Sequence, residues 1–142
     1  MLPQPQSAQT VKVWDIWVRI THWAVSAGIF VNLIVTEGGS DVHEYIGYAV
    51  VALVVSRLLW GLVGSQYARF SNFFPTPTRI REHMTDIKQH KFHGHLGHNP
   101  LGALMMFALW GVIIALGVTG YLQTTDQFWG DDSIQTIHEF LA

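Results

Sequence analysis

Long apolar stretches separated by short polar segments dominate the chain. Three of them, residues 16–36, 42–63 and 101–122, reach the length of about 20 residues that a helix needs to cross a bilayer core. A further helix-like pattern begins at about residue 134, and the nine residues from there to 142 are too few to cross a membrane. We therefore predict an all-α membrane protein with one domain over residues 1–142. The expected architecture is a transmembrane four-helix bundle with helix 4 only begun in this chain.

Residues at the boundaries of these stretches are typical of helix ends. Ser40 and Asp41 follow a pair of glycines, which suits a helix stop and a new N-cap. Asn99 and Pro100 suit the cap and first position of the third long helix. The gap between the second and third stretches is a long polar connection over residues 64–99.

Within this connection, Pro75 and Pro77 are expected to interrupt helical structure. Residues 79–91 then have an amphipathic pattern, with Ile80, Met84 and Ile87 on one side. The pattern predicts a short helix lying on the membrane surface or, as an alternative, a plain loop.

Composition supports the membrane assignment. The chain is 49% hydrophobic and only 13% charged, whereas soluble domains carry about 25% charged residues. With no cysteine, disulfides, thiolate metal sites, iron–sulfur clusters and covalent c-type haem attachment are excluded. The chain has no basic stripe with interleaved aromatics, so nucleic-acid binding has no support.

The charges are distributed asymmetrically between the predicted loops. All eight cations lie on one side of the predicted membrane: Lys12, Arg19, Arg57, Arg69, Arg79, Arg81, Lys88 and Lys91. The opposite side carries Glu37, Asp41, Glu44, Asp126, Asp131, Asp132 and Glu139. By the positive-inside rule, the N-terminus and residues 64–99 lie in the cytoplasm, and residues 37–41 and 123–133 in the periplasm of a bacterial inner membrane.

Three histidines lie near the ends of predicted spans, where an ionisable side chain suggests a function. His22 is near the cytoplasmic end of the first helix, whereas His43 and His138 begin the second and fourth helices at similar periplasmic depth. Each one alone is equally well explained as a hydrogen-bonded boundary residue. Two at matched depth on different helices favour a pair of axial ligands to one haem iron.

Neighbouring residues fit such a site. Gly47 lies one turn from His43 and leaves a gap for a porphyrin edge, and the same face continues through Val50, Val54 and Gly61. Arg57 and Arg69 are candidates to pair with haem propionates at the cytoplasmic side.

Other candidate sites are weaker. His22 has no obvious second histidine in the chain with which to ligate a haem. His98 is one candidate for this role. The histidine-rich run over residues 90–98 resembles a metal cluster, but it has no carboxylate or cysteine to complete a defined site, and it is interpreted as a solvated loop. Gly111, Gly117 and Gly120 are interpreted as a helix-packing surface.

Several motifs resemble one known family. Val13-Trp14-Asp15, Thr21-His22-Trp23, His43-Glu44-Tyr45-Ile46-Gly47-Tyr48, Arg57-Leu58-Leu59-Trp60-Gly61, Gly97-His98-Asn99-Pro100 and His138-Glu139 are similar to motifs of the bacterial cytochrome b561 family, which is related to the b-type cytochrome subunits of nickel–iron hydrogenases. The resemblance covers nearly the whole chain. It implies a four-helix, typically dihaem protein, with one haem b ligated by His43 and His138. A second haem would be ligated by His22 and a later histidine of helix 4.

The leading functional hypothesis is transmembrane electron transfer through b-type haem, one or two per chain. The resemblance implies exchange between membrane quinone and a periplasmic cytochrome c, a hydrogenase or another redox protein. No catalytic acid–base pair stands out. The alternatives are a haem-free membrane anchor or assembly subunit of a redox complex and, ranked last, a metal-ion transporter or sensor that uses the histidines of residues 90–98.

Overall fold

The computed structural model describes residues 15–66, 68–90 and 99–142, and every regular element in this part of the chain is a helix. The elements are α1 (Ile16–Ile34), α2 (Asp41–Val63), α3 (Phe70–Phe73), α4 (Pro77–Lys88), α5 (Pro100–Gln123) and α6 (Asp132–Leu141). The long helices α1, α2 and α5, and the start of α6, agree with the predicted bounds to within two residues, which is ordinary scatter for helix ends.

Two predicted helix caps are confirmed by hydrogen bonds. The Ser40 hydroxyl accepts from the His43 N–H at 3.3 Å, which fixes the start of α2. The Asn99 side chain accepts from the Gly102 N–H at 2.6 Å at the start of α5. Gly39, in the turn before α2, has a φ of +77°, a conformation that glycine adopts without strain.

The polar connection differs from the prediction in two ways. Pro77 is the first residue of α4 and does not interrupt helical structure there. Thr76 caps the helix, and a proline at the first position loses no helical hydrogen bond. This helix confirms the amphipathic pattern but ends at Lys88. A four-residue helix, α3, was not predicted, and Pro75 limits its length because a proline disfavours helical backbone before it.

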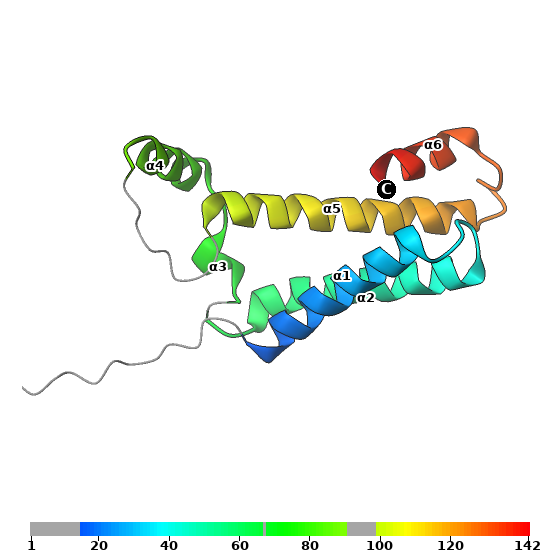
Figure 1. Cartoon of the computed structure of the whole chain (residues 1–142), viewed down its shortest axis with the longest axis horizontal. Coiled ribbons are helices and arrows are strands. Elements are labelled where there is room, and N and C mark those ends of the chain that lie inside the picture. Colours follow the sequence, from blue (N-terminus) through cyan, green and yellow to red (C-terminus); the bar gives the residue numbers. More distant parts are fainter. Residues whose placement is uncertain (1–14, 67, 91–98) are drawn as a thin grey trace, which may run out of the picture.

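The long helices pack as antiparallel neighbours. Helices α1 and α2 lie side by side, α2 packs against α5, and α6 folds back along α5 (Figure 1). Glycines allow these close contacts: a Cβ at Gly28 would lie 2.5 Å from Val50 Cγ2, and one at Gly117 would overlap the side chain of Val51. Gly117 therefore belongs to a helix-packing surface, as predicted, whereas a Cβ at Gly111 would meet nothing within 4 Å.

Two ends of the bundle can be distinguished (Figure 1). We call the end with the α1–α2 turn and the α5–α6 loop the histidine end, because His43 and His138 lie there. The opposite end, with α3, α4 and the start of α5, is called the cationic end. It holds Arg57, Arg69 and the arginines of α4.

Two described helices, α2 and α5, are long and apolar enough to cross a membrane. Helix α1 has 19 residues, among them Arg19 and His22, and is not one of these two helices, so the third span stays a prediction. Large apolar side chains are exposed along α2 and α5, such as Leu62 (67%) and Leu109 (53%). Lipid would cover such a surface in a bilayer, whereas water would not favour it.

Candidate haem site

The structure brings His43 and His138 together, although 95 positions separate them in the chain. Their ring centroids are 6.4 Å apart, and the ring planes meet at 62°. His43 lies in the first turn of α2, and His138 lies in α6, whose start is fixed by Asp131 accepting from two main-chain N–H groups. Both imidazoles are half-buried, so they can reach a ligand in the bundle while keeping one edge against protein.

One side of the His43 residue is held by α1. The ring nitrogen Nδ1 lies 3.2 Å from the Thr36 hydroxyl, and the Asn32 side-chain amide donates to the main-chain carbonyl of His43 at 3.0 Å. Both contacts join the end of α1 to the start of α2. They position the His43 ring relative to the neighbouring helix.

The His138 ring is held by α5 in a similar way. Its Nδ1 lies 2.8 Å from the hydroxyl of Thr119, a buried residue. A Cβ at Gly120 would lie 3.3 Å from Cε1 of the same ring. Gly120 thus lets the imidazole lie close against α5, which is a more specific role than the general packing surface predicted for it.

The paired rings meet the basic requirement of a metal held between two imidazoles. Metal–nitrogen bonds of about 2.0–2.1 Å on each side, with the ring radii added, separate the centroids by roughly 6 Å, close to the observed 6.4 Å. Among the described residues, no group of three or more histidine, cysteine or carboxylate side chains is placed to hold a metal ion. Two imidazoles are the number of protein ligands that a porphyrin-bound iron can take.

The predicted porphyrin face of α2 is only partly open. A Cβ at Gly47 would lie 3.7 Å from the Asn32 amide, so this gap faces α1. A Cβ at Gly61 would overlap the Phe70 ring. Val50 and Val54 are buried. The interpretation of Gly61 as porphyrin-facing is wrong, because an aromatic ring of α3 fills that space.

His22 lies apart from the other two candidate histidines, toward the cationic end of α1. Its ring is exposed and makes an edge contact with Trp23, with centroids 5.5 Å apart. Its main-chain carbonyl accepts from the Ser26 hydroxyl. No ring contact joins it to another histidine in the part of the chain that the structure describes, and His98, its alternative partner, lies outside that part.

Arg57 is enclosed at the cationic end, with only 5% of its surface exposed. Its guanidinium carbon lies 5.8 Å from the Phe70 ring centroid and 5.4 Å from that of Trp110. One terminal nitrogen donates to the Ala68 carbonyl at 3.3 Å, while the other, Nη1, is buried and has no hydrogen-bond partner among the described residues. An unpaired nitrogen on a buried cation is costly, so this position suits an anionic group.

Arg69 is exposed, and its Nε donates to the Gly64 carbonyl at 2.7 Å. Arg57 lies 14 positions after His43 in the same helix, which corresponds to about 21 Å along its axis. The two arginines are therefore remote from the His43–His138 pair and lie at the cationic end.

At the cationic end, the Asp15 carboxylate joins two helices, a contact that the sequence did not predict. We call it the carboxylate clamp. Asp15 accepts hydrogen bonds from the Trp60 indole at 2.9 Å, the Ser65 hydroxyl at 2.7 Å and the Val18 N–H at 2.8 Å. Burial disfavours the charged form, but these hydrogen bonds, with help from Arg57, outweigh it and lower the pKa of the Asp15 carboxyl. The clamp ties the start of α1 to the end of α2.

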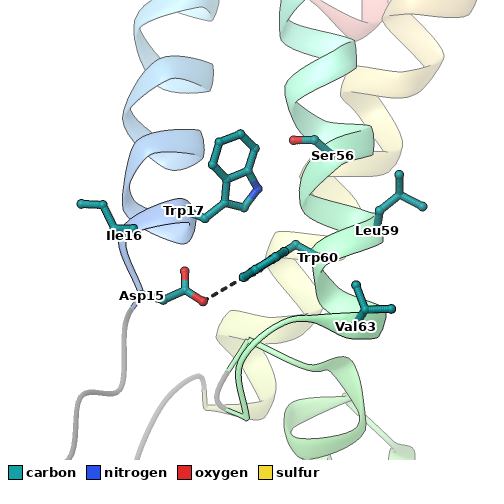
Figure 2. Close-up of a pocket in the computed structure, with 7 residues that line it drawn as sticks. All are labelled: Asp15, Ile16, Trp17, Ser56, Leu59, Trp60 and Val63. Atoms are coloured by element: carbon teal, nitrogen blue, oxygen red, sulfur yellow. Dashed lines mark hydrogen bonds between the residues drawn. The ribbon is translucent and has the colours of Figure 1, made fainter.

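Beside this clamp lies a pocket of about 460 Å³ between α1 and α2 (Figure 2). It is lined by Asp15, Ile16, Trp17, Ser56, Leu59, Trp60 and Val63. Two of its polar groups are already engaged, since the Ser56 hydroxyl donates to the Leu53 carbonyl and Asp15 accepts three hydrogen bonds. The pocket thus offers a mainly apolar surface.

Sequence reasoning missed Thr36 and Thr119, which contact the two histidines. A signal for Thr119 was present, because a hydroxyl stands out in a span without ionisable side chains. Thr36 lies seven residues before His43 across a turn, and only the folded turn shows that they meet. Of the histidine-rich run, only His90 lies within the described residues, where its φ is +54°.

The chain is similar to proteins of one known family. A family model described as prokaryotic cytochrome b561 matches residues 13–142. Proteins named probable Ni/Fe-hydrogenase B-type cytochrome subunit are similar to this chain. The one from Bradyrhizobium diazoefficiens is 26% identical over 140 residues, covering 79% of this chain and 57% of the relative. The one from Azotobacter vinelandii is 24% identical over 139 residues, covering 78% and 58%.

The chain thus spans a little over half the length of these relatives. No solved structure gives a significant match. The family match extends over nine-tenths of the sequence and includes all three candidate histidines. The chain therefore belongs to the prokaryotic cytochrome b561 family.

Proposed function

We propose that this protein transfers electrons across the bacterial inner membrane through b-type haem held between its helices. The observation that carries the proposal is the His43–His138 pair, with ring centroids 6.4 Å apart. Membership of the cytochrome b561 family supports it. Haem bound there would supply one-electron chemistry through the ferrous and ferric states of its iron.

In this proposal the chain supplies ligation, burial and charge. His43 and His138 would hold the haem iron, and Gly47 would leave room beside α2. The half-buried position of the pair, against α2, α5 and α6, would limit the access of water to the site. With both positions taken by imidazole, the iron would be suited to electron transfer rather than to binding a substrate.

A second haem at the cytoplasmic side is part of the proposal. His22 would be one ligand, completed by a histidine from a continuing fourth helix. Arg57 and Arg69 would pair with propionates of this haem. The unpartnered Nη1 of Arg57 supports such a role, because a carboxylate would satisfy a buried cation that otherwise lacks one hydrogen bond.

We propose a four-helix transmembrane bundle with the N-terminus in the cytoplasm, forming one domain over residues 1–142. The described cations support this orientation, because Arg57, Arg69 and those of α4 gather at one end of the bundle. The exposed tryptophans support a transmembrane placement without setting its orientation, since Trp17 and Trp23 lie toward that end and Trp129 lies at the other.

The partners proposed are membrane quinone on one side and a redox protein on the other. The names of the relatives, which describe cytochrome subunits of a nickel–iron hydrogenase, favour a hydrogenase. A periplasmic cytochrome c is the alternative. The hydrogenase or the cytochrome c would approach the histidine end of the bundle, whose rim carries acidic residues.

A reduced-minus-oxidised spectrum of the solubilised protein tests the function, with a pyridine haemochrome assay to count haem per chain. We expect a sharp b-type α-band and one or two haems per chain. A colourless protein, expressed with adequate haem, would contradict the proposal. That outcome would favour a haem-free membrane anchor, in which the histidines are boundary residues.

A further inference from the structure

We propose that Thr36 and Thr119 are positioning residues, which accept a hydrogen bond from Nδ1–H of His43 and of His138. Each hydroxyl holds its imidazole in the tautomer that leaves Nε2 unprotonated and free to ligate a metal. The inference about the tautomers stands on the hydrogen bonds of this chain. Its consequence for haem rests on the proposed function.

At Thr119 the direction of the hydrogen bond is inferred from how many contacts it satisfies. A threonine hydroxyl has one proton to donate and two lone pairs that accept. The Thr119 oxygen lies 2.9 Å from the Ala115 carbonyl and 3.1 Å from the Leu116 carbonyl of its own helix, and 2.8 Å from His138 Nδ1. If the hydroxyl proton lies on a carbonyl and Nδ1–H donates to the oxygen, the hydroxyl makes two hydrogen bonds, whereas donation to an unprotonated Nδ1 leaves it only one.

The same count applies at Thr36. Its hydroxyl donates to the main-chain carbonyl of Asn32 at 3.0 Å, with the Asn32 side-chain oxygen a second acceptor at 3.3 Å. With its proton on Asn32, it can also accept from Nδ1–H of His43 at 3.2 Å, which again gives the hydroxyl two hydrogen bonds. Asn32 also donates to the His43 carbonyl, so the acceptor and the histidine are held by the same residue.

The arrangement has two physical consequences. A ring nitrogen bound on one side fixes the rotation of the imidazole, and an acceptor on Nδ1–H makes the ligand nitrogen more basic. A more basic ligand stabilises the ferric state and lowers the reduction potential. The contact between Thr119 and His138 is shorter than that between Thr36 and His43, and Thr119 is buried whereas Thr36 is half-buried. Thr119 should therefore have the larger effect on the reduction potential.

Thr21 offers a matched control. It is buried, and its hydroxyl donates to main-chain carbonyls at 2.9 and 3.1 Å, as that of Thr119 does. Among the described residues, its hydroxyl is hydrogen-bonded to no imidazole. Thr21→Val therefore removes the same helix contacts as Thr119→Val, without touching a histidine.

The first experiment uses the haem-loaded, detergent-solubilised protein in a His22→Ala background, so that one haem is observed. We expect Thr119→Val to weaken haem affinity about 10–100-fold and to raise the midpoint potential. Thr36→Val should give a smaller change in the same direction. Thr119→Ser, which keeps the hydroxyl, and Thr21→Val should behave like the parent. Equal affinity and potential in Thr119→Val and Thr21→Val would overturn the proposal.

The second experiment uses haem-free protein and does not depend on the proposed function. Nitrogen-15 NMR of labelled histidine reports which ring nitrogen carries the proton. For His138, assigned by its loss in His138→Ala, we expect a protonated Nδ1, with a mixture of tautomers in Thr119→Val. Protonation at Nε2 in the parent would overturn the inference. If the parent binds no haem yet shows protonated Nδ1, the proposed function fails while the tautomer assignment holds.

Discussion

The histidine end and the cationic end hold their polar side chains differently. At the histidine end, two half-buried imidazoles each use one ring nitrogen on a threonine hydroxyl. At the cationic end, the Asp15 carboxylate accepts three hydrogen bonds, and Arg57 is enclosed by Phe70 and Trp110. Among the described residues, the second ring nitrogen of each imidazole has no hydrogen bond to the protein, whereas the cationic end uses its carboxylate to join helices.

This difference separates two tasks within one bundle. Asp15 accepts hydrogen bonds from α1, α2 and the segment after α2, so it suits a structural clamp. The imidazoles have capacity left for a ligand. Arg57 Nη1 is the exception at the cationic end, because it too has an unused hydrogen bond. Substitutions at the cationic end should therefore affect folding first, and those at the histidine end should affect haem first.

The largest effect on stability is expected for Arg57→Ala. The change removes the side chain packed against two aromatic rings, leaves a cavity and deprives the Ala68 carbonyl of its donor. We expect a loss of about 2–4 kcal/mol in the free energy of unfolding, measured by denaturant titration in detergent. Arg69→Ala, at an exposed guanidinium, is the control and should lose much less. Equal losses would show that enclosure of Arg57 adds no stability.

Next in size is Gly61→Ala, because a Cβ there overlaps the Phe70 ring. Displacing that ring should cost about 1–3 kcal/mol in unfolding free energy. Gly111→Ala is the matched control, since a Cβ there meets nothing within 4 Å. It should stabilise helix α5 by up to about 1 kcal/mol. Thermal unfolding of both variants checks the packing of α3 on α2, and a neutral Gly61→Ala would contradict it.

Gly120→Ala tests the other end with the same type of substitution. Its Cβ would lie 3.3 Å from Cε1 of His138, so the imidazole must shift by a few tenths of an ångström. We expect the unfolding free energy to change little and haem affinity to fall about tenfold, as for other disturbances around a metal ligand. Haem transfer to an excess of a haem-accepting apoprotein measures the loss. A stability loss without a haem effect would contradict the difference between the two ends.

The smallest effect is expected at Asp15. Asp15→Asn keeps the shape and can still cap α1, but an amide nitrogen cannot accept from Trp60 and Ser65 as the second carboxylate oxygen does, at a cost of about 1 kcal/mol. Because the folded pKa of Asp15 is lowered, its ionised form stabilises the fold at pH values above the unfolded pKa. This contribution is lost as the pH falls through the folded pKa. Unfolding curves between pH 7 and acid should therefore be less pH-dependent in Asp15→Asn, and identical slopes would contradict the clamp.

The long helices could be predicted because their signals are local. Apolar length identified α1, α2 and α5, and the residues at Ser40 and Asn99 marked helix starts. The meeting of His43 and His138 followed from their matched depth on neighbouring helices, and the structure brings their rings together. Their role as haem ligands stays a prediction.

Contacts between distant residues could not be predicted in this way. Asp15 meets Ser65 across 50 positions, and the Phe70 ring fills the space beside Gly61 through a short helix that carries little periodicity of its own. Such contacts depend on how the connection after α2 folds back. The pairing of Thr119 with His138 likewise requires α6 to fold against α5.

The central claim is that His43 and His138 ligate one and the same haem. Its most direct test is a pyridine haemochrome count of the purified parent, His43→Ala, His138→Ala and the double variant, with His22→Ala as the control. We predict that each single variant loses the same haem, that the double variant loses no more than either, and that His22→Ala keeps this haem. Unchanged haem content in both single variants would contradict the account.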